Sequence, residues 1–260
     1  MNRIVSVLAM HARDRATWFV IPLSVLGAGF AIVLLIALSV DMLFGGATPI
    51  YTGALTTFYF VMILVGIGAV TRTFPFAIGF GARRRDYLLG TLAMGAVVSA
   101  AWGILLGLLS LIEANLVHYW GVGLHFFHLP VFSDGSPFRQ FCWSYYQDTA
   151  CMRSDPNYYN NHAPLQQFWV YFALLLFLFL LGLLLGSIYQ RFGRIGEYAF
   201  FGVVFLLLSV FILVSAIWNW WDAIFGWFDG QSAATLGVWL LPPMALFALA
   251  SYALLRKATV

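Results

Sequence analysis

Charged residues are scarce in this chain. They make up 9% of its 260 residues, whereas roughly a quarter of the residues of a soluble domain are charged. Hydrophobic residues account for 62%, and the mean hydropathy is +0.90. So few polar groups cannot cover a surface that faces water, which excludes an ordinary soluble domain. The composition predicts a single all-α polytopic membrane domain over residues 1–260.

Lysine is almost absent, with Lys257 as its one instance, and there is no G-x-x-x-x-G-K-[ST] loop. That loop cradles the phosphates of ATP. We therefore expect no ATPase site and no other cofactor in this chain. If ATP drives its activity, hydrolysis takes place in a separate polypeptide. The basic residues flank apolar runs instead of forming a patch, which argues against a nucleic-acid partner.

The interiors of the long apolar runs contain no acid, base or histidine. About 20 apolar residues cross a bilayer as a helix, and six runs qualify: 18–40, 51–71, 87–112, 168–189, 198–218 and 234–255, with Pro242 and Pro243 interrupting the last. Ionisable residues inside spans usually mark ion or proton paths, so a proton-coupled transporter is disfavoured. An intramembrane hydrolase is disfavoured too, since the runs hold no Ser-His pair, aspartate pair or H-E-x-x-H motif. Glu113 and Glu197 lie at run boundaries, where we expect them to reach water.

Eleven of the thirteen Lys and Arg residues fall on one side of the six runs. Cytoplasmic loops carry this excess, so both ends of the chain are expected in the cytoplasm. The first run is too long for the core of a cleaved signal peptide, and we expect it to remain. Residues 1–17 have apolar positions at near-helical spacing, which predicts an interfacial helix. A solvated basic tail is the alternative.

Cysteine is also scarce, and Cys142 and Cys151 both lie in the segment 113–167. The predicted topology places this segment outside the cell, in an oxidising compartment. A disulfide closing this short loop would contribute about 2–3 kcal/mol by the loop-closure model, and two unpaired thiols are the alternative. The aromatic content of 113–167 predicts an ordered cap on the outer mouth.

Four of the five histidines lie in the same outer segment, namely His118, His125, His128 and His162. The i, i+3 spacing of His125 and His128 suits a metal only if further ligands are present. Packing is the preferred interpretation, and we expect no metal site. A membrane-bound enzyme or a metal or haem redox subunit that uses these histidines is the alternative.

Glycine and tryptophan patterns predict how the spans pack and where they meet the interface. Gly103 and Gly107, and likewise Gly182 and Gly186, are pairs at one-turn spacing that allow close helix approach. The segment 218–230, WNWWDAIFGWFDG, is typical of an interfacial aromatic belt. It predicts a short surface or re-entrant helix that anchors the chain at the interface; substrate stacking is the alternative.

The segment 72–91, RTFPFAIGFGARRRDYLLGT, holds four of the basic residues and lies between the second and third runs. Phe74-Pro75 suits a helix start, and Gly79 and Gly81 suit its end. Asp86 would lie in the first turn of the next helix, where the helix dipole favours an acid. Apolar surface in a cytoplasmic loop needs lipid or a protein partner. We therefore predict a short helix that contacts another protein; a basic loop that only sets topology is the alternative.

These features resemble the membrane permease subunit of an ATP-binding-cassette (ABC) exporter of the type-2 class, over nearly the whole chain. The stretches that carry the resemblance are FPFAIGFGARRRDYLLGT (74–91), LGLLLGSIYQRFGR (181–194) and the C-terminal LFALASYALLRKATV. The resemblance implies a bacterial plasma (inner) membrane, separate ATPase subunits that hold ATP and Mg, and a second permease chain, identical or different. It also implies export of a hydrophobic or amphipathic drug, antibiotic, peptide or lipid.

The resemblance further implies roles for particular residues. The segment 72–87 would dock on the ATPase through Phe74, Pro75, Phe76, Ile78, Phe80, Arg83, Arg84, Arg85, Asp86 and Tyr87. The substrate path would be lined by spans two and five of two chains, through Phe58, Met62, Phe205 and Ser209. The long outer segment 113–167 departs from the family pattern. A structural or sensory membrane protein without transport activity is a third hypothesis.

Overall fold

The computed structural model describes residues 3–44, 50–127, 164–229, 233–256 and 258. Within these residues the chain is all-α except for two short turns of other helix types and one pair of two-residue strands. The α-helices are α1 Arg3–Arg13, α2 Ile21–Phe44, α3 Leu55–Thr71, α4 Thr73–Gly79, α5 Arg84–Asn115, α6 Pro164–Ile217, α7 Trp221–Asp229, α8 Ala233–Trp239 and α9 Leu241–Arg256. The π-helical turn η1 spans Ala16–Val20, the 3₁₀ turn η2 spans Tyr119–Gly121, and the strands are β1 Ile50–Tyr51 and β2 Leu124–His125.

Five helical segments in the described part of the chain are long and apolar enough to cross a membrane: Ala16–Leu43, Leu55–Gly79, Arg84–Glu113, Gln167–Ile217 and Thr235–Arg256. The prediction of an all-α polytopic chain is therefore confirmed at this level. The fourth segment contains 51 residues, or about 77 Å of helix at 1.5 Å per residue, more than twice a hydrocarbon core of about 30 Å. It merges the runs 168–189 and 198–218, which were expected to be separate.

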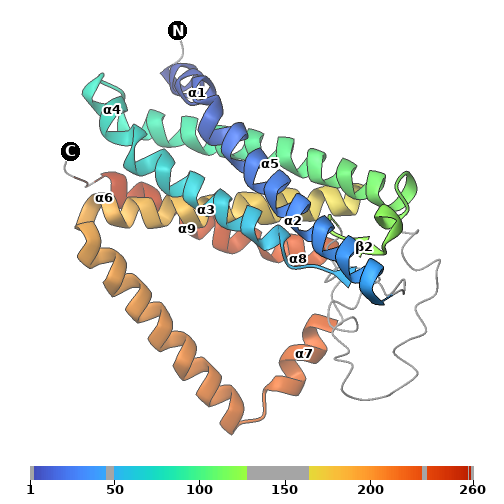
Figure 1. Cartoon of the computed structure of the whole chain (residues 1–260). Coiled ribbons are helices and arrows are strands. Elements are labelled where there is room, and N and C mark those ends of the chain that lie inside the picture. Colours follow the sequence, from blue (N-terminus) through green and yellow to red (C-terminus); the bar gives the residue numbers. More distant parts are fainter. Residues whose placement is uncertain (1–2, 45–49, 128–163, 230–232, 257, 259–260) are drawn as a thin grey trace.

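Gly193 divides α6 into two parts that point in different directions. Its backbone has φ 68° and ψ −161°, a conformation that costs little only without a Cβ atom. The part before Gly193 lies in the helical bundle, and the part after it leaves the bundle and leads to α7 (Figure 1). We call the second part, residues 194–217, the distal half of α6.

The two ends of the bundle carry different segments (Figure 1). The start of α1, the end of α9, α4, the start of α5 and the bend of α6 lie together at one end. The end of α5 and the paired strands β1 and β2 lie at the other. The segments that the Lys and Arg count assigns to the cytoplasm thus share one end, which we call the basic end; the opposite one is the outer end.

Close backbone contact between α3 and the first half of α6 forms the centre of the bundle. A Cβ atom on Gly182 would overlap the Ile63 carbonyl, and one on Gly66 would overlap a carbonyl oxygen of α6. The predicted packing role of Gly182 is confirmed. In the other predicted pair, Gly103 would place a Cβ 3.2 Å from a backbone nitrogen of α6, whereas Gly107 faces open space.

Two other expectations about helix boundaries are confirmed. The last run is broken where α8 ends at Trp239 and α9 begins at Leu241, so that Pro242 and Pro243 lie in the first turn of α9. Proline is tolerated there because the first-turn N–H groups have no partner within the helix. The aromatic segment 218–230 contains a helix, α7.

The predicted N-terminal helix exists as α1, and one of its faces packs on α5. Val7 and His11 are buried. His11 Nε2 lies 3.0 Å from the Thr91 hydroxyl oxygen, which in turn donates to the Tyr87 carbonyl at 2.9 Å. The hydroxyl hydrogen is thereby used, so His11 is the donor to Thr91. The rings of His11 and Trp18 form a T-shaped pair, with 5.5 Å between their centroids.

We expect the folded chain to lose stability as the pH falls from about 6.5 to about 4. Burial lowers the pKa of His11 from 6.5 to about 4, although Asp14 acts in the opposite direction. Between these values the unfolded chain binds more protons than the folded one, so acidification favours unfolding. Above pH 6.5 neither state is protonated at this residue, and no stability is lost. Burial lowers the pKa of His125 to about 4 as well.

Thermal melting between pH 4 and 7 tests this expectation. His11→Gln keeps a hydrogen-bond donor but does not titrate, so it should remove about half of the dependence of the melting temperature on pH. His125→Gln should remove a similar part. A slope that neither substitution alters would contradict the assignment.

Candidate docking site at the basic end of the bundle

The predicted short helix between spans two and three is α4. A single residue, Arg72, separates it from the end of α3, and it finishes at Gly79. Gly81, with φ +80°, then turns the chain toward α5. Pro75 is the third residue of α4, where no backbone donor is needed. Asp86 lies in the first turn of α5, as predicted.

Phe74 and Tyr87 fasten α4 to α5. Both side chains are fully buried, and their ring centroids lie 5.2 Å apart. The Tyr87 hydroxyl lies 2.8 Å from Thr73 Oγ1 and donates to the carbonyl of Ala69 on α3. The resemblance places both residues on the docking surface. In the structure they lie in the interior instead, where they pack beneath the exposed side of α4.

Phe76 and Phe80 form the exposed part of the site. Their side chains are 57% and 79% exposed, and their ring centroids lie 4.5 Å apart. They are four residues apart, so their rings meet on one side at the end of α4. Ile78 is half-buried and packs against the core. The two exposed rings are called the aromatic pair below.

The arginines around the aromatic pair have different environments. Arg72, Arg83 and Arg85 are exposed. Arg84 instead donates from Nη1 to the carbonyl oxygens of Leu255 at 3.2 Å and Arg256 at 2.7 Å. These carbonyls belong to the last turn of α9, where a cation also complements the helix dipole. Arg84 is therefore a cap for α9, and the other three arginines are free to face a partner or lipid headgroups.

We expect Arg84→Ala to lower the free energy of unfolding by about 1 kcal/mol, since two carbonyl oxygens lose their donor. Arg85→Ala removes the same charge from an exposed position and should change it by less than about 0.5 kcal/mol. Denaturant unfolding of the two variants in the same detergent measures the difference. Equal losses would mean that Arg84 does not cap α9.

The four residues expected to line a substrate path occupy different environments. Phe58 and Met62 are fully buried, and the Phe58 ring lies 5.0 Å from that of Trp102. Phe205 is 74% exposed on the distal half of α6, one turn before Ser209, whose hydroxyl donates to the Phe205 carbonyl at 2.9 Å. Within one chain, the first pair belongs to the core and the second lies outside it.

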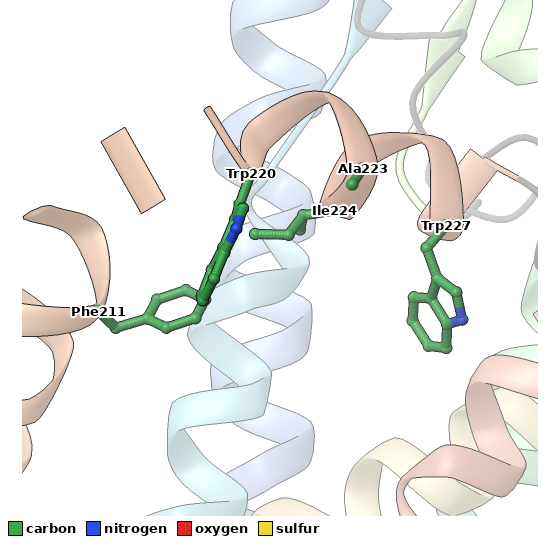
Figure 2. Close-up of a pocket in the computed structure, with 5 residues that line it drawn as sticks. All are labelled: Phe211, Trp220, Ala223, Ile224 and Trp227. Carbon is green, nitrogen blue, oxygen red and sulfur yellow. The ribbon is translucent and has the colours of Figure 1, made fainter. Parts of the chain in front are cut away.

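An apolar hollow of about 430 Å³ lies between the distal half of α6 and α7 (Figure 2). Its lining residues are Phe211, Trp220, Ala223, Ile224 and Trp227. The rings of Phe211 and Trp220 lie beside each other (Figure 2). The volume falls in the range of small-molecule sites, about 300–1,000 Å³. Its described lining residues offer apolar contact and no charged group.

At the outer end the expectation for Glu113 is wrong, and the expectations for the cysteines and two histidines are not tested. Glu113, expected to reach water, is fully buried and accepts three hydrogen bonds. Among the described residues no group of three or more His, Cys, Asp or Glu side chains could hold a metal. Cys142, Cys151, His128 and His162 lie outside the described residues, so the disulfide and the expected packing of the outer histidines stay predictions.

Sequence reasoning missed the internal roles of Arg84, Tyr87 and Glu113. One signal was available for Glu113, because an acid beside an apolar run needs nearby donors, and the glycine-rich stretch after it allows the chain to turn back. Arg84 and Tyr87 had no such signal. Comparisons of the chain with protein-family models, with curated proteins and with solved structures found no match.

Proposed function

We propose that this chain is the permease subunit of an ATP-driven exporter, of the ABC type-2 class, and that a separate ATPase subunit docks on α4. The aromatic pair is the observation that carries the proposal. Two large apolar side chains are exposed at the basic end, on a helix whose other face is fixed to α5. An exposed apolar patch on a rigid support is typical of a protein contact.

The proposed topology has six spans with both termini in the cytoplasm of a bacterium. It treats the two parts of α6 as separate crossings joined at Gly193. The length of α6 supports this division, and so do Arg191 and Arg194, which flank the bend. The bend then lies on the same side as α4 and the start of α1, as positive-inside counting requires.

α5 connects the proposed docking site to the other side of the membrane. It is continuous over 32 residues, about 48 Å. Tyr87 near its start is bonded to α3 and packed on α4. A displacement of α4 by ATP-driven closure of the ATPase subunits would therefore move α5 as a rigid body.

The distal half of α6 is the surface on which we place a second permease chain. Its side chains are exposed around the helix, with Phe201, Phe205 and Ile212 at 54%, 74% and 51%. Lipid or another chain has to cover such a helix. The neighbouring apolar hollow supports a hydrophobic cargo, because its lining residues can hold an apolar body without pairing a charge.

Co-purification followed by reconstitution tests the function. The tagged chain, extracted from native membranes, should bring with it an ATPase with Walker motifs and Mg-dependent ATP hydrolysis. Proteoliposomes of this complex should extrude a fluorescent hydrophobic dye only when ATP is added. Bound haem or stoichiometric metal in a preparation that lacks any ATPase would instead favour the redox alternative.

A further inference from the structure

Glu113, in the last turn of α5, is a buried carboxylate around which the following chain folds. Its Oε1 accepts from the Phe126 backbone N–H at 2.7 Å and from Trp120 Nε1 at 3.1 Å. Its Oε2 accepts from the Phe127 backbone N–H at 2.9 Å. Burying a carboxylate is costly unless donors surround it, so the segment 116–127 and Glu113 depend on each other.

The segment is held in a strained conformation. His118, Tyr119 and Trp120 have φ values of 45°, 55° and 60°. Even a single residue other than glycine rarely adopts this left-handed conformation. Three in succession persist only where the surroundings hold them in place. The bond from Trp120 to Glu113 supplies one such restraint, and the Trp120 ring packs 4.7 Å from that of Phe30 on α2.

The same segment contacts several other elements at the outer end of the bundle. Leu124 and His125 pair with Ile50 and Tyr51, in the connection between α2 and α3. The hydroxyl of Tyr171 on α6 donates to the Phe127 carbonyl. Through these contacts one short stretch after α5 connects to α2, to the α2–α3 connection and to α6.

We propose that residues 116–127 form an outer latch, and that Glu113 holds it shut. Loss of the Glu113 bonds lets the strained turn relax, and α2, α5 and α6 are then free to separate at the outer end of the bundle. The role of the latch as an exit gate rests on the proposed transport function. The latch itself rests only on the contacts described above.

Hydrogen exchange on the full-length chain in detergent tests the latch. Glu113→Gln keeps the size of the side chain but replaces one acceptor oxygen with an amide donor that faces other donors. Exchange in peptides covering 118–127 should become faster by about tenfold or more. Peptides covering 73–87, at the other end of α5, should be unchanged.

Asn115→Ala is the matched control, because Asn115 is exposed and, within the described part of the chain, its side chain bonds locally to the Leu111 carbonyl at 3.0 Å. It should leave all peptides at the wild-type rate. If Glu113→Gln does not fold, Trp120→Phe decides the matter, since it removes one donor and keeps a ring against Phe30. It should raise exchange in 118–127 by a smaller factor.

Local exchange that is unchanged in the folded variants, or faster by the same factor along the whole chain, overturns the latch. Faster local exchange supports it even if wild-type proteoliposomes show no ATP-driven transport. In that case the latch stands and only its role as an exit gate fails. Active transport together with unchanged exchange in the variants would reject the latch and leave the transport function intact.

Discussion

Replacing Phe76 and Phe80 together with alanine is expected to abolish both co-purification of the ATPase and ATP-driven transport, without changing the melting temperature of the chain. The two rings are 57% and 79% exposed, so their removal costs little internal packing. Aromatic anchors at protein interfaces typically contribute about 2 kcal/mol or more each. Loss of both would weaken docking roughly a thousandfold.

Phe74→Ala is the comparison that separates docking from folding. Phe74 is fully buried against Tyr87, so its truncation should lower the stability of the chain by about 3–5 kcal/mol. A reduced ATPase yield in that variant would follow from unfolding. Retention of a stoichiometric ATPase in the double variant Phe76→Ala/Phe80→Ala would show that α4 docks no such partner.

Gly182→Ala is expected to cost about 3 kcal/mol or more, the upper part of the range for overpacking. The added methyl group would overlap the backbone carbonyl of Ile63. A backbone atom in the middle of a helix cannot rotate away as a side chain can, so α3 and α6 would have to separate. Gly66→Ala should behave similarly because its Cβ would meet the backbone of α6.

Gly68→Ala provides the matched control on α3. A Cβ at Gly68 has nothing within 4 Å, and alanine favours a helix over glycine by about 1 kcal/mol. This variant should be as stable as the wild type or slightly more so. Thermal melting followed by size-exclusion chromatography compares the variants, and equal losses at positions 68 and 182 would contradict the close crossing of α3 and α6.

Composition and short-range sequence pattern were sufficient to predict several features of this molecule. The scarcity of charge required lipid as solvent and apolar helices as the spanning elements. Proline in the last run and the glycines after Phe76 located breaks that the structure contains, because these residues act on the backbone within a few positions. Asp86 was placed correctly for the same reason, since a helix dipole acts over one turn.

Whether a side chain in the candidate site is buried or exposed depends on partners that are distant in the sequence. Tyr87 is bonded to Ala69, and Arg84 to carbonyls of the last turn of α9, 171 and 172 residues later. Two of the predicted docking residues were therefore interior anchors and a third was a helix cap. Phe76, Phe80, Arg83 and Arg85 are exposed, and Pro75, Ile78 and Asp86 are half-buried.

Hydropathy alone does not tell which spans pack against each other, because a helix buried in protein and a helix surrounded by lipid are equally apolar. The runs 168–189 and 198–218 have similar composition, yet the first lies in the bundle and the second leaves it (Figure 1). For Glu113 the decisive contacts come from amides 13 and 14 residues away, where the strained turn directs them inward. Charge and apolar length set which segments are apolar enough to cross a membrane, whereas the buried bonds of Arg84, Tyr87 and Glu113 exist only once the helices are assembled.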